Sequence, residues 1–262
     1  MQPVTNYARI LLPDGTVATG ALSEEGSVDA GGVNHEPGSF TFLPPVVPTK
    51  LVCAGFNYRA HANEMAEAVP DAPLIFFKPP SAVVGHEATI TRPPSVVSRM
   101  DYEGELVVVI GRRARDVPAA DALSYVEGLT IGNDVTARQF QVAGAQWTRA
   151  KGYDTFAPIG PAVWRTTEWA GRALETRLNG KVVQSATTDR LIFDVPTLIA
   201  WISSIMTLEQ GDLIMTGTPS GVGPMEDGDV VEIAIEGLGC LRNTVGATQP
   251  VLVAREPVGA SE

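Results

Sequence analysis

The sequence predicts an α+β fold built on a large mixed β-sheet, with a small β module in front of it. Segments typical of strands outnumber helical patterns, and the two do not alternate regularly, which argues against a doubly wound or barrel fold. The 262 residues include 26 Gly and 20 Pro, a content typical of many turns. This length suffices for one substantial core or for one large and one small domain.

The small module is expected over residues 1–45 and the main domain over residues 46–262. Residues 7–22 alternate in polarity around Pro13-Asp14-Gly15 and therefore predict a β-hairpin. The prolines of residues 43–48 fix an extended connector, which sets the boundary between the two parts.

The main domain is expected to hold most of the strands. Residues 174–186 predict a hairpin, because Asn179-Gly180 between two β-type runs is the strongest turn signal in the chain. Other segments are short and rich in apolar or β-branched residues, as buried strands are. They cover residues 51–56, 74–78, 102–111, 129–134, 212–217 and 229–245.

Helices are predicted at three places in the main domain. Residues 57–69 predict a short helix with Asn57 as its N-cap. Residues 118–127 predict a second helix, opened by a proline. Asp194 caps a third helix, which has Pro196 in its first turn and apolar residues at helical spacing.

Charge and composition exclude several classes of function. The formal net charge of −11 argues against partners such as nucleic acid or anionic membrane surfaces. The sequence has no signal-peptide pattern and no apolar run of membrane-spanning length. Cys53 and Cys240 lie in no CxxC motif and are expected to be reduced structural thiols. We therefore expect a cytoplasmic protein.

The segment Glu103-Gly104-Glu105 places two carboxylates on one face of a predicted strand, because residues two apart point the same way. The run that follows is apolar enough to be interior, and two buried carboxylates side by side need a cation between them. Asp134, at the end of another predicted strand, could add a third oxygen. Such hard ligands suit Mg²⁺, Mn²⁺ or Ca²⁺ rather than zinc. An edge strand that exposes both glutamates to water explains the same spacing equally well.

His61 and Glu64 stand three residues apart on a predicted helix and so share one of its faces. A carboxylate beside an imidazole fixes its tautomer and raises its basicity, which prepares a general base. Such a base could activate a water or take a proton from a carbon acid. An exposed helix with an incidental His–Glu pair is the more common explanation of this spacing alone.

Basic residues and a glycine-rich segment accompany these groups. Lys78 ends a predicted buried strand and is expected to point into a cavity, whereas solvation at the surface is the ordinary state of Arg138 and Lys151. Residues 216–223 form a turn whose N–H groups could bind a carboxylate. The segment lacks the features of a P-loop or a nucleophile elbow, and no dinucleotide fingerprint follows a strand.

Seven segments of the chain, taken in order, resemble the catalytic domain of the fumarylacetoacetate hydrolase superfamily over about residues 50–245. They read AGFNYRAHANEM, PLIFFKPPSAVVG, MDYEGELVVVIGRRARDV, GLTIGNDVTARQFQ, WTRAKGYDTFAPIGP, LNGKVVQSATTDRLIFDVP and TLEQGDLIMTGTPSGVG. The resemblance implies a bacterial-type single catalytic domain with a short N-terminal β module. It also implies the large mixed β-sheet roll of that family and a homodimer.

By this resemblance, Glu103, Glu105 and Asp134 are the ligands of Mg²⁺ or Mn²⁺. His61 and Glu64 match the dyad that activates a water or moves a substrate proton. Lys151 matches the lysine that contacts the metal site and the oxygen of the substrate. Thr218 matches a residue of the loop that holds a substrate carboxylate. The polar residues that match the lining of the pocket are Lys78, Arg138 and Gln141.

The resemblance implies a hydrolase that cleaves a C–C bond in a small anionic β-diketo or 2-oxo acid, through a metal-bound enolate. Acylpyruvate, fumarylpyruvate and fumarylacetoacetate are substrates of this type. One alternative is a decarboxylase or isomerase of aromatic catabolism, acting on compounds of the 2-hydroxyhepta-2,4-diene-1,7-dioate type, or an oxaloacetate decarboxylase. Another is a noncatalytic domain that binds metal and acid. Phe56 stands where some acylpyruvate-cleaving members carry a basic residue, which leaves the substrate open.

Overall fold

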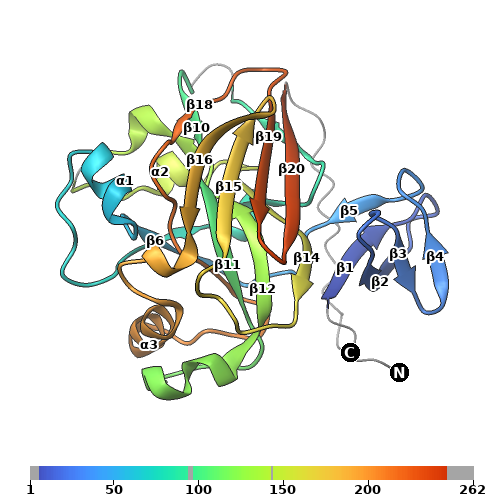
Figure 1. Cartoon of the computed structure of the whole chain (residues 1–262), viewed down its shortest axis with the longest axis horizontal. Helices are drawn as coiled ribbons and strands as arrows, with labels where there is room; N and C mark the ends of the chain where they lie inside the picture. The colour runs from blue at the N-terminus through green and yellow to red at the C-terminus, as the bar shows by residue number, and fades with distance from the viewer. Residues whose placement is uncertain (1–5, 94–96, 143, 247–262) are drawn as a thin grey trace, which may run out of the picture.

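The computed structural model describes residues 6–93, 97–142 and 144–246 (Figure 1). Its largest element is a 12-stranded sheet of order β4-β3-β2-β1-β14-β12-β11-β17-β6-β7, with β5 beside β1 and β8 beside β14. Most neighbours are antiparallel, but β6 runs parallel to β17 and β8 to β14, so the predicted mixed sheet is confirmed. The strands are β1 (Asn6–Leu11), β2 (Val17–Leu22), β3 (Val28–Ala30), β4 (Val33–His35), β5 (Thr41–Leu43), β6 (Leu51–Gly55), β7 (Leu74–Lys78), β8 (Val83–Val84), β11 (Gly104–Ile110), β12 (Val126–Asn133), β14 (Ala157–Trp164) and β17 (Leu213–Met215).

Two smaller sheets complete the main domain. One has five strands in the order β16-β15-β19-β20-β9, and the other has the order β13-β10-β18. The hairpin predicted around Asn179-Gly180 is confirmed as β15 and β16. The strands are β9 (Thr89–Thr91), β10 (Met100–Tyr102), β13 (Thr136–Ala137), β15 (Ala173–Leu178), β16 (Lys181–Thr187), β18 (Gly223–Pro224), β19 (Val230–Ile235) and β20 (Gly239–Gly246).

Strand β11 is covered by other parts of the main domain on both of its faces. Leu106, Val108 and Ile110 belong to a core cluster that also includes side chains of β19, β20 and the helix α3. Val107 and Val109 point the other way, into a second cluster with side chains of β6, β14 and β17. Because both faces of β11 are covered, its sequence is a continuous apolar run rather than an alternating one.

The helices are short. The one that begins after Asp194 is α3 (Val195–Ile205), and the predicted cap is confirmed, since the Asp194 carboxylate accepts a hydrogen bond from Thr197 N. The others are α1 (Arg59–Glu64), α2 (Thr148–Lys151) and the 3₁₀ helices η1 (Pro80–Ala82), η2 (Ala119–Tyr125), η3 (Arg138–Phe140) and η4 (Thr188–Arg190). Within the described ranges, no helix is long and apolar enough to cross a membrane.

Two helix predictions need correction. The helix predicted over 118–127 is a 3₁₀ helix, η2. The helix predicted over 57–69 is only α1, and Asn57 does not cap it. The buried side chain of Asn57 instead donates to Phe193 O and Thr216 O and accepts from Phe193 N. These bonds fix the start of α1 to two distant loops.

Strands β1 to β5 form a lobe at one end of the molecule (Figure 1). The predicted hairpin around Pro13-Asp14-Gly15 is confirmed as β1 and β2. The lobe has its own small core, in which Ala8, Ile10 and Val28 pack with Ala162 of the main domain. Strand β1 also pairs with β14, so the lobe is hydrogen-bonded to the large sheet.

Candidate active site

Three carboxylates meet where β11 begins and β12 ends. Glu103 directly precedes β11, Glu105 lies on it, and Asp134 directly follows β12. The register aligns Gly104 with Asn133, and Asp134 N donates to Glu103 O at 2.9 Å. Each residue offers one carboxylate oxygen within 4.8 Å of the others, and all three side chains are buried. The surface-strand explanation of the Glu-x-Glu spacing is therefore wrong.

Gly104 allows the second sheet to pack directly behind these carboxylates. A Cβ atom at this position would lie 2.3 Å from Thr176 Oγ1 and 3.1 Å from Ile233 Cγ2. The absence of a side chain lets β15 and β19 approach β11 closely. As a result, Glu103 and Glu105 point toward the cavity from a strand that is covered on its other face.

Two of the carboxylates are neutralised by buried cations. Lys151 Nζ lies 2.8 Å from Glu103 Oε2 and 2.6 Å from Asp134 Oδ2, and Lys78 Nζ lies 2.6 Å from Asp134 Oδ1. Arg138 Nη2 lies 2.6 Å from Glu103 Oε1. Burial alone would raise the pKa of Glu103, but Lys151 and Arg138 outweigh it and hold that pKa well below its usual range.

Glu105 lacks such a partner. Its carboxylate accepts a hydrogen bond of 2.7 Å from Gly217 N, and no described basic side chain lies within ion-pair distance of it. Burial, together with the charges of Asp134 and Glu103, raises the pKa of Glu105 well above its usual value. A buried carboxylate with too little positive charge around it, next to two further hard oxygen donors, fits a divalent cation such as Mg²⁺ or Mn²⁺.

Arg138 is held in place by a residue that the sequence analysis missed. Asp101, fully buried on β10, accepts a hydrogen bond from Arg138 Nε at 2.8 Å and binds Arg99 through both carboxylate oxygens. Arg138 also donates to Gln141, which lines the cavity. Asp101 therefore orients the arginine that neutralises Glu103. Asp101 stands two residues before Glu103, and in an extended chain such residues point to the same face. This spacing could have indicated from the sequence that Asp101 belongs to the site.

His61 and Glu64 form the predicted pair on α1. His61 Nδ1 lies 3.0 Å from Glu64 Oε2, and Glu64 Oε1 accepts a hydrogen bond of 2.9 Å from Gly221 N. His61 is only 3% exposed and lines the cavity, so the explanation as an incidental pair on an exposed helix is wrong. Because Nδ1 faces Glu64, Nε2 is the nitrogen left to exchange a proton with a bound molecule.

The glycine-rich segment approaches the carboxylates from β17. The hydroxyl of Thr218 donates to Gly104 O at 3.0 Å and accepts from Gln184 Nε2 at 2.8 Å. Gln184, buried on β16, also accepts from Gly104 N and donates to Pro219 O. The hydroxyl proton of Thr218 is thus already used within the protein. Gln184, another residue missed from the sequence, fixes this loop against β11.

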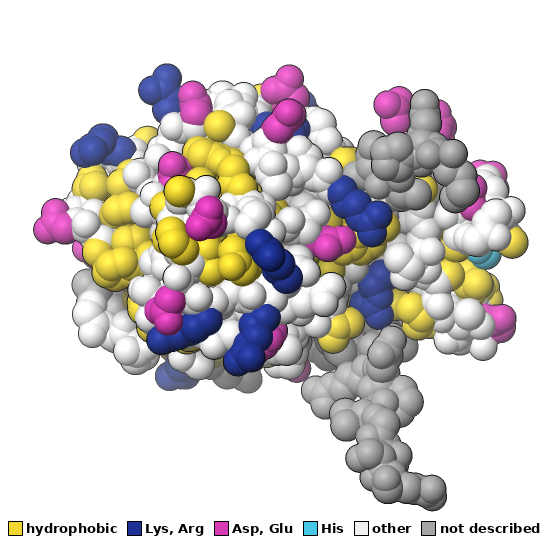
Figure 2. All heavy atoms as spheres, turned by 90° about the horizontal axis from the view of Figure 1, so that it is seen from below, with side chains coloured by type: hydrophobic (Ala, Val, Ile, Leu, Met, Phe, Trp, Pro, Cys, Tyr) yellow, Lys and Arg dark blue, Asp and Glu magenta, His cyan; other side chains and the backbone are white. Residues whose placement is uncertain are grey.

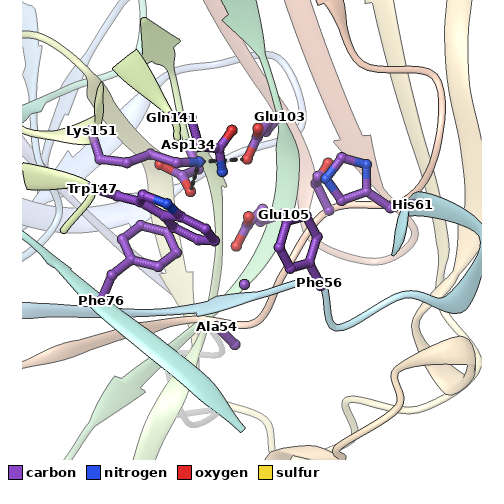
Figure 3. A pocket seen from close by; sticks show the side chains of 12 residues that line it. Ala54, Phe56, His61, Phe76, Glu103, Glu105, Asp134, Gln141, Trp147 and Lys151 are labelled. Atoms are coloured by element: carbon purple, nitrogen blue, oxygen red, sulfur yellow. Dashed lines mark hydrogen bonds and ion pairs between the residues drawn. The ribbon is translucent and has the colours of Figure 1, made fainter. Parts of the chain in front are cut away.

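One cavity joins these groups, with an empty volume of about 240 Å³ including its open mouth (Figure 3). Among the residues predicted from sequence, Lys78, Arg138 and Glu64 do not line it but stand behind lining residues. The aromatic residues Phe76 and Trp147 also line it and were not predicted from the sequence. The cavity is lined by Ala54, Gly55, Phe56, His61, Phe76, Glu103, Glu105, Asp134, Gln141, Trp147, Lys151 and Thr218.

Comparison with known proteins identifies the family. The profile of the fumarylacetoacetate (FAA) hydrolase C-terminal domain matches residues 50–246. The structure of 2-hydroxyhepta-2,4-diene-1,7-dioate isomerase from Mycobacterium marinum is 41% identical, with a TM-score of 0.84 over 93% of this chain and 99% of that one. The mitochondrial oxaloacetate tautomerase of Rattus norvegicus is 41% identical over 217 residues, which cover 78% of this chain and 69% of that protein.

A third similar protein was crystallised with ligands in place. Fumarylpyruvate hydrolase from Pseudomonas aeruginosa, in complex with Mn²⁺ and pyruvate, is 34% identical, with a TM-score of 0.73 over 81% of this chain and 94% of that one. These three relatives are named as an isomerase, a tautomerase and a hydrolase, and all three are enzymes. The predicted resemblance is confirmed: this chain belongs to the fumarylacetoacetate hydrolase family.

Proposed function

We propose that the protein is a divalent-metal-dependent enzyme that moves a proton at the carbon beside the oxo group of a small 2-oxo acid. It would interconvert oxo and enol forms or shift the double bond of an enol. The observation that carries this proposal is the position of His61, which faces the three buried carboxylates across one cavity (Figure 3). The tautomerase and isomerase at 41% identity support the same type of reaction.

Glu103, Glu105 and Asp134 would hold Mg²⁺ or Mn²⁺, because they offer three hard oxygens that lie close together. When bound there, such a cation would supply Lewis acidity at the oxo group of a 2-oxo acid, and this would make the neighbouring C–H bond more acidic. The Mn²⁺ in the fumarylpyruvate hydrolase structure supports the choice of cation.

His61 would be the base that transfers the proton. Glu64, held by Gly221 N, accepts the Nδ1 proton of the imidazole and so keeps Nε2 free to act as the base. Nε2 takes a proton from the carbon and returns it to the oxygen or to the next carbon along the chain. The glutamate stabilises the imidazolium that forms in between. A positioned base of this kind contributes about 10²–10⁴ in rate.

Lys151 and Gln141 would orient the substrate. The ammonium group of Lys151 lines the cavity between Glu103 and Asp134, and both carboxylates raise its pKa although burial would lower it. It therefore stays charged and can stabilise negative charge on a substrate oxygen. Gln141, whose carbonyl accepts from Arg138, has its amide N–H groups left to hydrogen-bond the acid.

A second candidate is hydrolysis of a C–C bond in an acylpyruvate-type acid. The same His61–Glu64 pair could deprotonate a water, and that water would attack the carbonyl group remote from the acid. The similarity to a hydrolase crystallised with pyruvate supports this reading. Loss of carbon dioxide from oxaloacetate would need neither the base nor the water. Replacement of His61 would therefore leave decarboxylation in place while it lowers the rates of the other two reactions.

Turnover of metal-stripped protein, with and without added Mn²⁺ or Mg²⁺, tests the proposal. The substrates are oxaloacetate, acetylpyruvate, fumarylpyruvate and a 2-hydroxydienoate, followed by ultraviolet absorbance with product analysis. We expect metal-dependent conversion between oxo and enol forms without pyruvate or carbon dioxide release. His61→Asn should lower this rate about 10²–10⁴-fold, whereas His35→Asn, outside the site, should not. Pyruvate formed together with acetate from acetylpyruvate, or with fumarate from fumarylpyruvate, would establish hydrolysis instead. Pyruvate formed with carbon dioxide from oxaloacetate would establish decarboxylation, and a His61→Asn variant with full activity would refute both candidates.

A further inference from the structure

Three aromatic side chains form one wall of the cavity. Phe56, Phe76 and Trp147 lie on the side away from Glu103 and Gln141 (Figure 3). The ring centroids of Phe56 and Trp147 are 5.5 Å apart, and those of Phe76 and Trp147 are 5.2 Å apart, both in edge-to-face arrangements. We call these three residues the aromatic wall.

The wall is fixed by the backbone beneath it. A Cβ atom on Gly55 would lie 2.8 Å from Trp147 Cζ3, so only glycine lets the indole pack there. Phe56, the next residue, has a φ of 52°, which is unfavourable for a bulky side chain. Its ring lies 5.9 Å from the imidazole of His61. This strained conformation keeps the Phe56 ring between the proposed base and Trp147.

The basic groups near the cavity are already engaged by carboxylates. Lys151 and His61 are the basic side chains among the described lining residues, and Lys151 bridges Glu103 and Asp134. Behind the lining, Arg138 is bound by Asp101 and Glu103. Lys151 Nζ lies 5.0 Å from the centroid of the Phe76 ring, so Phe56 and Trp147 are the part of the wall without a neighbouring ammonium group. A carboxylate placed against these two rings would lose its hydration and meet ring faces that carry partial negative charge.

We infer that the site selects 2-oxo acids with a single carboxylate and an uncharged remaining chain, and that Phe56 is a specificity-determining residue. This inference rests on the proposed function, because the oxo acid end must bind at the three carboxylates. Phe56 neighbours His61, so it contacts the part of the substrate that follows the carbon at which His61 acts. An apolar substrate chain gains free energy when it leaves water and packs against the three rings. A charged chain loses its hydration there, and no interaction with the rings compensates for that loss.

Binding of a matched pair of acids tests this selectivity without turnover. 2-Oxopentanoate and 2-oxoglutarate have the same length and differ only in a terminal methyl or carboxylate group. We expect calorimetric titration of the Mn²⁺-loaded protein to give a dissociation constant at least about tenfold lower for 2-oxopentanoate. Phe56→Arg should reduce or invert this ratio by about tenfold, and the control Phe56→Leu should keep the preference for the monoacid.

The outcomes separate the two proposals. Equal or tighter binding of 2-oxoglutarate by the wild type overturns the inference while leaving the 2-oxo acid site in place. An unchanged ratio in a Phe56→Arg protein of normal thermal stability overturns the role of Phe56. If that variant does not fold, the wild-type ratio still decides the selectivity. Failure of both acids to bind the Mn²⁺-loaded protein overturns the proposed function and this inference with it.

Discussion

Glu105 occupies an unusual electrostatic position among the buried residues of the site. Its neighbours Glu103 and Asp134 each bind two basic side chains, whereas Glu105 is met by the backbone N–H of Gly217. A buried charge without a counter-charge destabilises the folded chain. The metal-free protein therefore carries an electrostatic cost at this residue, which a bound divalent cation would offset.

Glu105→Gln should consequently have opposite effects with and without metal. In metal-free protein we expect the unfolding temperature to rise, by an amount equivalent to about 1 kcal/mol. Glutamine removes a buried carboxylate that must otherwise either keep an uncompensated charge or take up a proton on folding. Wild-type protein at about 100 times the dissociation constant of Mn²⁺ should gain about 2.7 kcal/mol, or roughly 5–10 °C for a chain of this size. The variant should lose most of that gain.

Thermal unfolding of both proteins, with Mn²⁺ and with a chelator, measures these shifts. Glu25→Gln, which removes an exposed carboxylate, serves as the control and should behave as the wild type. An equal Mn²⁺-induced shift in Glu105→Gln and wild type would contradict the assignment of Glu105 as a metal ligand.

At this scale the sequence could predict neighbours that share a strand or a helix turn, and little else. Glu103 with Glu105, and His61 with Glu64, follow from periods of two and of three to four residues. Contacts across sheets carry no such signal. Gln184 reaches Thr218, 34 residues away, and Asp101 reaches Arg138, 37 residues away, through strand pairings that depend on the whole fold.

Among the secondary structure elements, prediction succeeded where the chemistry is local. Turn residues mark the hairpins, and Asp194 marks the start of α3, because each acts on backbone groups within a few residues. The helix over 57–69 was predicted too long because Ala66 adopts a φ of 55°, past the end of α1. Glycine usually occupies that conformation at the end of a helix, so an alanine at this position does not predict that the helix ends there.

His86 connects the N-terminal lobe with the main domain and should make the stability depend on pH. Its ring packs edge-on against Phe42, and its Nδ1 accepts a hydrogen bond from Arg242 N, which requires an unprotonated nitrogen. Burial lowers the pKa of His86, Glu87 opposes this, and the charge of Arg242 adds to it. The unfolded chain then binds a proton more readily than the folded one.

This difference in proton binding makes the folded protein more stable at higher pH. The contribution of His86 is fully present above the ordinary histidine pKa of about 6.5 and is lost as pH falls from there toward the lower folded value. We expect the free energy of unfolding, from urea titrations between about pH 5 and 7.5, to rise with pH. His86→Asn should flatten the rise relative to wild type, and His35→Asn should not. Identical pH profiles for wild type and His86→Asn would refute this role.

In the whole molecule, the site depends on pairings between distant parts of the chain. Strand β1 joins Asn6 and Tyr7 to Trp164 and Val163 of β14, and β17 joins Leu213 to Leu51 of β6. Composition and strand count sufficed to predict an α+β mixed sheet. The order of strands could not be predicted from residues alone, since no turn chemistry encodes partners more than a hundred residues apart.

One side of α3 exposes apolar side chains, and we propose that it joins two copies of the chain. Trp201 and Ile205, four residues apart on α3, share one side of that helix and are 39% and 51% exposed. Figure 2 looks at the side on which Figure 1 places α3, and hydrophobic side chains gather there over the main domain. Contiguous exposed apolar surface with a tryptophan is typical of an interface between subunits.

Light scattering on a sizing column should therefore give twice the chain mass of 27.7 kDa. A two-fold dimer places the same patch on both copies, so one substitution removes two sets of contacts. Trp201→Glu should shift the mass to that of a single chain at micromolar concentration, because it buries two unpaired carboxylates in the interface. Val33→Glu makes the same change at an exposed residue of the N-terminal lobe and should leave the dimer intact. A wild type with the mass of one chain would refute the dimer, and a dimeric Trp201→Glu would place the interface elsewhere.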